Sequence, residues 1–166
     1  MKTKYTDEEL LAQRLAGILP RIDIAGQQFI IDWRLKELRD ARDASVRIDL
    51  HGLPIDETGE QYLFFYNTRL KKADPPDPKM THLPKDVVLL KIPYEMKLDP
   101  VGVAREYGLP DMELLERFPI QRELKVTVIP LDETELVQLV KRNRDKQRLL
   151  GIKPSAIKRR AKGKGL

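Results

Sequence analysis

Residues 21–36 carry the sequence RIDIAGQQFIIDWRLK, which predicts a β-hairpin. Ile22 and Ile24 alternate with polar residues, at the period of a strand that buries one face. We expect Gly26-Gln27 to form a tight turn, because a glycine in a short connection between two apolar runs favours a hairpin. The apolar run 29–31 then supplies the second strand.

A second copy of this pattern follows in the chain. Residues 47–52 (RIDLHG) match residues 21–26 (RIDIAG), and residues 64–71 (FFYNTRLK) match residues 29–36 (FIIDWRLK). The second copy is nine residues longer, which places an insertion within 53–61. We interpret each copy as strand, turn and strand, so the sequence predicts a duplicated hairpin that serves as scaffold. A duplicated ligand-binding hairpin is the alternative.

Further elements precede and follow the two copies. Thr6 and Glu9 have the spacing of a capping box, so we expect a helix over 6–19. Residues 86–93 are apolar at most positions and predict a central strand. Residues 123–130 alternate apolar and polar side chains and predict a strand with one solvent-exposed face.

Two more helical regions are predicted in the second half of the chain. Residues 99–118 favour two short helices, because 108–110 (GLP) interrupts the run and 112–118 resumes it. Acidic residues in the second helix disfavour a DNA-reading helix-turn-helix, so we interpret the pair as a structural corner. The last helix, 132–150, has an apolar stripe that fades after Leu139, which predicts that the helix leaves the body as a basic rod.

Together these elements predict an α+β fold. We expect a mostly antiparallel sheet built from two similar β-hairpins plus two further strands, flanked by N-terminal, central and C-terminal helices. Residues 73–79 contain three prolines and predict a stiff loop. The length of 166 residues favours one domain over residues 1–150, followed by a basic tail, 151–166, that we expect to be flexible when unbound.

The net charge of +5 is unevenly distributed along the chain. Residues 141–166 hold eleven basic side chains and one acid, whereas the remaining 140 residues hold 20 basic and 25 acidic ones. A basic block of this kind attracts polyanions, so we predict a nucleic-acid-binding role for its eleven members. They are Lys141, Arg142, Arg144, Lys146, Arg148, Lys153, Lys158, Arg159, Arg160, Lys162 and Lys164.

The partner that this block predicts is nucleic acid, DNA or RNA, because neutralised phosphates release condensed counterions. The alternatives for the block are a solvated tail that aids solubility and a tail that folds back on the acidic body. A protein–protein adaptor whose acidic body binds a partner is the second hypothesis for the whole chain. We expect no membrane partner, since the tail lacks a large apolar face. With no cysteine, no signal peptide and no apolar run of about 20 residues, the sequence predicts a cytoplasmic protein.

Candidates for catalysis are weak in this sequence. Asp49 and His51 are two residues apart in a predicted strand, Asp23 is the matching acid of the first copy, and His82 lies in a predicted loop. Such groups can hold a divalent metal, so Asp23, Asp49 and His51 are metal-ligand candidates for a metal-dependent hydrolase. The chain contains no phosphate-binding glycine loop and no serine nucleophile motif. The sequence therefore predicts no catalytic residue and no cofactor, and it favours a protein that is not an enzyme.

Aromatic side chains cluster in the second strands of the two copies. They are Trp33, Tyr62, Phe64, Phe65 and Tyr66. Aromatic residues in strands usually belong to the core, and we expect that here. The alternative is a sheet face on which these rings, interleaved with basic residues, stack the bases of a single-stranded nucleic acid.

Overall fold

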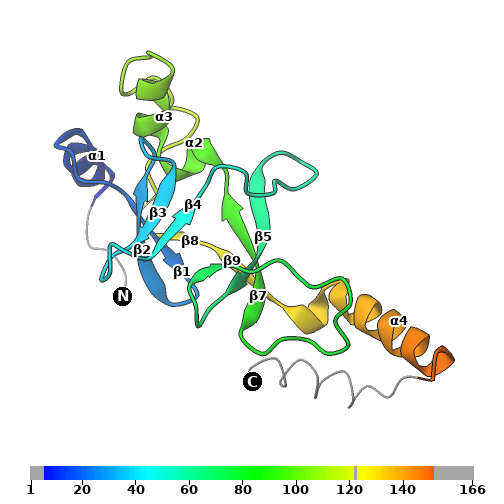
Figure 1. Cartoon of the computed structure of the whole chain (residues 1–166). Coiled ribbons are helices and arrows are strands. Elements are labelled where there is room, and N and C mark those ends of the chain that lie inside the picture. Colours follow the sequence, from blue (N-terminus) through cyan, green and yellow to red (C-terminus); the bar gives the residue numbers. More distant parts are fainter. Residues whose placement is uncertain (1–5, 122, 152–166) are drawn as a thin grey trace.

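The computed structural model describes residues 6–121 and 123–151, and it shows an α+β fold built on two sheets (Figure 1). In spatial order, the first sheet comprises β4 (Arg47–Asp49), β3 (Glu37–Asp40), β2 (Gln27–Asp32), β1 (Arg21–Ile24) and β8 (Leu124–Lys125). The second comprises β6 (Lys72–Ala73), β5 (Gln61–Asn67), β7 (Val87–Pro93) and β9 (Thr127–Pro130). All pairs are antiparallel except β1 with β8, so the predicted fold class is confirmed.

Helices lie at the N-terminus, in the central region as a short pair, and at the C-terminus, as the sequence predicts, but the first helix of the short pair precedes the predicted range 99–118. They are α1 (Asp7–Leu15), the short pair α2 (Glu95–Leu98) and α3 (Pro100–Glu106), the single-turn 3₁₀ helix η1 (Leu131–Glu133) and α4 (Leu136–Leu149). Thr6 caps α1 as expected, because its Oγ1 accepts a hydrogen bond of 3.1 Å from the backbone N–H of Glu9. None of the helices in the described part of the chain is long and apolar enough to cross a membrane.

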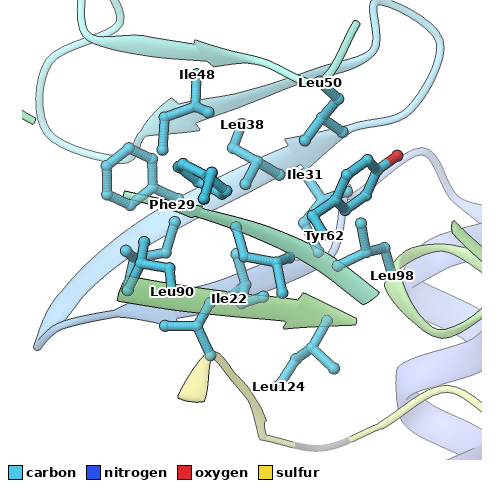
Figure 2. Close-up of a cluster of buried hydrophobic side chains, with 14 of the residues drawn as sticks. Ile22, Phe29, Ile31, Leu38, Ile48, Leu50, Tyr62, Leu90, Leu98 and Leu124 are labelled. Atoms are coloured by element: carbon cyan, nitrogen blue, oxygen red, sulfur yellow. The ribbon is translucent and has the colours of Figure 1, made fainter. Parts of the chain in front are cut away.

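The main core is an apolar layer that the two sheets share, and a smaller cluster lies around Leu131. Figure 2 shows Ile22, Phe29 and Leu38 of the first sheet gathered with Tyr62 and Leu90 of the second. All five side chains are at most 4% exposed. Burial on this scale stabilises a fold by about 2 kcal/mol for each large apolar side chain, so this layer determines how the two sheets face each other.

One segment belongs to both sheets. Leu124 and Lys125 pair with β1, and the following residues, Thr127–Pro130, pair with β7. Val126 lies between the two strands, is 5% exposed, and donates its N–H to the carbonyl of Asp23 at 3.1 Å. The single strand predicted over 123–130 therefore passes from one sheet to the other and joins them along one side.

The first predicted hairpin is confirmed, with its turn one residue earlier than expected. β1 and β2 pair with Ile24 opposite Gln27, which makes Ala25 and Gly26 the turn residues. Both have positive φ, 52° and 87°, as a two-residue hairpin turn with the twist of the flanking strands requires. The Asp23 carboxylate supports the turn by accepting the N–H of Gly26 at 2.8 Å.

The prediction of a second, equivalent hairpin is wrong. β4 pairs with β3 in the first sheet, whereas β5 pairs with β6 and β7 in the second. β4 pairs with β3, the mostly polar stretch Glu37–Asp40. Leu38 and Asp40 are the buried positions of β3, which is the alternation of a strand with one face inward. The long insertion then leads β5 into the other sheet, where its aromatic face meets the core.

The resemblance between 29–36 and 64–71 corresponds to a repeated strand and turn. The Asp32 side chain accepts the N–H of Leu35 at 3.1 Å, and the Asn67 side chain accepts the N–H of Leu70 at 2.9 Å. Each turn ends in a lysine, Lys36 or Lys71, with φ of 55°. The repeat therefore specifies a turn geometry and not a whole hairpin.

The lysine of the second turn connects the two sheets. Lys71 Nζ lies 2.8 Å from Oδ2 of Asp40, whose side chain is fully buried at the end of β3. The N–H of Arg42 donates to the same carboxylate at 2.8 Å. The Lys71 ammonium and the Arg42 N–H lower the pKa of the Asp40 carboxyl to about 2, against the opposing effect of burial.

Replacing Asp40 by Asn is predicted to destabilise the protein by about 3 kcal/mol at neutral pH, because it leaves the lysine without its partner. The folded-state pKa lies below the unfolded value of about 3.9. The contribution of the ionised carboxylate is therefore complete above about pH 4 and decreases as the pH falls toward 2. Urea denaturation of both proteins between pH 2 and pH 7 measures this difference. The control is Glu57→Gln at an exposed position, and an equal loss for both variants contradicts the prediction.

A second buried ion pair joins α1 to α3. Arg14 donates Nε and Nη2 to the two oxygens of Asp99 at 2.9 and 2.8 Å, and the two side chains are 9% and 1% exposed. Asp99 also caps α3 by accepting the N–H of Gly102 at 3.0 Å. A Cβ on Gly102 would lie 2.3 Å from the Asp99 Oδ2 atom, so this helix position requires glycine.

Gly102→Ala is predicted to destabilise the protein by about 2 kcal/mol, because the new methyl group displaces the carboxylate that holds Arg14. At an unconstrained helix position alanine stabilises the helix by about 1 kcal/mol relative to glycine. The sign of the stability change of Gly102→Ala therefore shows whether the contact with Asp99 constrains this position. Thermal denaturation followed by circular dichroism measures the effect. A Gly102→Ala protein that unfolds at a higher temperature than the parent would refute the role of this glycine.

The prediction of a helix over 112–118 is wrong. Residues 111–117 form consecutive turns, and the central short pair is α2 and α3. Asp111, the expected cap, instead accepts two hydrogen bonds from Arg105 at 2.9 and 3.0 Å. Because residues 112–118 form no helix, the helix pair predicted over 99–118 does not exist in that form. Neither the interpretation as a DNA-reading helix-turn-helix nor the interpretation as a structural corner therefore holds.

Candidate nucleic-acid interface

The basic helix α4 begins one turn after the second sheet ends. β9 leads into η1 and then into Leu136–Leu149, and Figure 1 shows this helix extending away from the sheets. At 14 residues it is about 21 Å long. Leu136 and Val140 are buried, and Leu136 packs in a small apolar cluster with Val87 and Leu131.

The end of the proline-rich stretch 73–79 and the residues that follow it hold the middle of α4 by hydrogen bonds; we call the whole segment 73–85 the proline-rich loop. Asn143 donates its side-chain amide to the carbonyls of Pro78 and Met80 at 2.9 and 2.7 Å. Arg144 donates Nε to the carbonyl of Thr81 at 2.7 Å. Contact therefore continues beyond Leu139, where the apolar stripe ends, and the prediction that the helix leaves the body at that point is wrong. A proline-rich loop leaves carbonyl groups free to accept these bonds.

The five predicted binding residues that the structure describes have different environments. Lys141, Arg142 and Lys146 are exposed, and no ion pair involves them within the described residues. Arg148 pairs with Asp145 one turn earlier, and Arg144 is engaged with the loop. Three cations are thus available to a ligand outright, and the charge of Arg144 remains at the surface.

A shallow groove runs along one side of α4. Its volume is about 500 Å³. Three apolar side chains, Leu83, Val137 and Val140, and three basic ones, Lys141, Arg144 and Arg148, line it. The helical positions of the groove share one face because they recur at intervals of three or four residues.

The other six predicted binding residues lie outside the described residues. They are Lys153, Lys158, Arg159, Arg160, Lys162 and Lys164. The predicted flexible tail falls on the same segment, apart from Gly151, so the tail and its phosphate contacts stay predictions.

Sequence reasoning predicted the stiff loop over 73–79 but missed that α4 packs against the end of this loop and the residues after it. Lys79, His82 and Lys85 are exposed in the segment whose carbonyls receive Asn143 and Arg144. Nothing in their spacing connects them to residues about 60 positions later. The available signal was Asn143 itself, an uncharged residue within a run of cations.

The metal-ligand candidates are not brought together. Asp49 lies in β4 and Asp23 in β1, with β3 and β2 between them, a separation of about 14 Å. His51 Nδ1 lies 2.9 Å from Asp49 Oδ1, and hydrogen bonds from the His51 backbone and ring lower the pKa of Asp49. Both side chains are largely exposed, and the residues described include no group of three or more potential metal ligands. The hydrolase hypothesis therefore loses its predicted site.

The aromatic cluster belongs to the core, as expected. Trp33, Tyr62, Phe64 and Tyr66 are at most 4% exposed, and Phe65 is half-buried against the cluster around Leu131. Burial raises the pKa of Tyr66 to about 12. The alternative of a base-stacking sheet face is wrong, because β5 turns alternate aromatic residues toward the first sheet.

Comparisons with known protein families, with curated proteins and with solved structures found no match for this chain.

Asn143→Ala is predicted to destabilise the protein by about 1–2 kcal/mol, because two carbonyls lose their donor. The loss should be local, so hydrogen exchange of the Met80 amide, which donates to Asp77, is expected to accelerate. Arg142→Ala on the exposed side of the same helix serves as control and is expected to change stability by less than about 0.5 kcal/mol. Unchanged exchange in the Asn143 variant would show that this contact does not hold the loop.

Proposed function

We propose that this protein is a non-enzymatic, nucleic-acid-associated accessory protein that contacts phosphates through α4 and the basic chain that follows it. The observation that carries the proposal is the way α4 is held. Asn143 and Arg144 attach it to the proline-rich loop, which leaves Lys141, Arg142 and Lys146 exposed. An anchored helix presents its cations at a lower cost in conformational entropy than a free chain does.

The charge distribution supports a polyanionic partner. All of the surplus positive charge lies in residues 141–166, and the rest of the chain is acidic. The acidic remainder repels phosphates, so a nucleic acid approaches from the side of α4. Binding of this kind depends on counterion release and weakens steeply as salt increases. The absence of cysteine fits a reducing compartment, and we place the activity in the cytoplasm.

Fluorescence anisotropy with labelled DNA and RNA, each single-stranded and duplex, tests the proposal at two salt concentrations. The full chain is expected to bind in the micromolar range or tighter at low salt, and the 1–150 fragment should lose most of this affinity. A full-length variant with Gln at Lys153, Lys158, Arg159, Arg160, Lys162 and Lys164 should behave like the fragment without any change in the body. If full chain and fragment bind equally, the tail has no role; if neither binds at low salt, the proposal fails.

A protein–protein adaptor is the second candidate, and three exposed apolar side chains close together in the sequence favour it. Tyr107, Leu109 and Met112, in the turns after α3, are 57%, 39% and 56% exposed. Apolar side chains that lie together on a surface are a frequent feature of protein interfaces. A partner captured by the full chain and lost on Leu109→Ser with Met112→Ser would favour this function. Capture that both proteins share equally would remove the surface from consideration.

A further inference from the structure

We infer that α4 and the loop 77–85 form one continuous basic surface whose ligand is the phosphate backbone of a duplex nucleic acid. This inference rests on the proposed function and names its ligand class and its second protein segment. We call it the α4–loop surface and define it by Lys79, Lys85, Lys141, Arg142 and Lys146, all exposed.

The two segments are fixed relative to each other by three hydrogen bonds. The carbonyls of Pro78, Met80 and Thr81 lie 2.7–2.9 Å from donor atoms of Asn143 and Arg144. Lys79 lies between two of these carbonyls in the sequence. Leu83 lines the same groove as Lys141 and Arg148, which places the continuation of the loop along α4 as well. The loop that carries Lys79 and Lys85 therefore runs beside α4, which brings its lysines into the neighbourhood of the cations of the helix.

The net charge of the two segments, the loop and α4, is positive, whereas the net charge of the other described residues is negative. Residues 77–85 and 136–151 hold seven basic and two acidic side chains, whereas the other described residues hold 15 basic and 24 acidic ones. Both acids are already engaged. Asp77 accepts the N–H of Lys79 at 2.9 Å, and Asp145 pairs with Arg148. These two segments thus carry a net positive charge, and each of their two carboxylates already accepts a hydrogen bond from a neighbouring residue.

The aromatic residues favour a duplex over a single strand. Proteins that bind single strands without sequence preference stack bases on exposed aromatic rings. Among the described residues the large exposed aromatic side chain is Tyr107, which follows α3, far from α4 (Figure 1). Phe65, under the start of α4, is half-buried in the apolar cluster. The loop 77–85 carries one exposed ring, that of His82, so among its described residues the α4–loop surface offers several cations for phosphates and no cluster of rings for stacking.

The packing of α4 also determines how it meets a duplex. A recognition helix enters the major groove with its contacting face free. Here one face of α4 is occupied by the loop and the free positions carry long cations, so we expect α4 to contact the phosphate backbone. Phosphate contacts of this kind position a protein without distinguishing base sequence.

The test is binding by the full chain with Lys79→Glu and Lys85→Glu introduced together. The matched control is Lys97→Glu with Lys125→Glu, which makes the same change of net charge at two other exposed lysines. Anisotropy titrations use a duplex of about 20 base pairs and an oligothymidine of equal length, at about 50 and 200 mM salt. Circular dichroism confirms that both variants are folded.

The loop variant is expected to bind the duplex at least about tenfold more weakly than the parent, with the salt dependence reduced by about two phosphate contacts. The control should weaken binding by a much smaller factor, and the parent should prefer duplex to oligothymidine. Equal weakening by both variants would show that net charge matters and the loop does not, which overturns the inference while the proposed function stands. A preference for oligothymidine overturns the assignment of a duplex. No binding by the parent refutes the proposed function itself.

Discussion

The apolar layer between the two sheets is the constraint on which the other features of this structure depend. Ile22 and Leu38 from the first sheet and Tyr62 and Leu90 from the second are buried in one cluster. Each sheet alone would expose one apolar face to water, and burying these two faces against each other supplies the main favourable term in folding. The segment 124–130 pairs with both sheets and closes this layer along one side.

Two buried carboxylates attach the periphery to this layer, and both use a cation from a distant part of the chain. Asp40 binds Lys71 between the sheets, and Asp99 binds Arg14 between α1 and α3. Pairs of this kind specify an arrangement more than they stabilise it, because desolvation offsets much of the Coulombic attraction. Many arrangements of turns and helices could cover the same apolar core. These two ion pairs favour the one arrangement in which each carboxylate meets its cation.

Polar contacts to a distant part of the chain also fix the position of α4. Its apolar contacts end near Val140, and polar contacts to the loop carbonyls then continue the attachment. A predominantly basic helix is marginal in isolation because like charges repel and few apolar side chains are buried. Anchoring by Asn143 and Arg144 turns it into a defined cationic surface beside Lys79 and Lys85, which is the basis of the proposed binding of phosphates.

Local patterns in the sequence determined the class of the fold, the capped start of α1, the β1–β2 hairpin and the position of the positive charge. These features depend on residues close together in the chain, where alternation, capping and composition act directly. The sequence also contained the repeated turn that ends at Lys36 and Lys71. Only the tertiary structure decided that β4 and β5 belong to different sheets, that Asp23 lies far from Asp49, and that the loop holds α4. Each of these outcomes depends on long-range pairing and burial, because free energy from contacts between distant residues is not encoded in any local pattern.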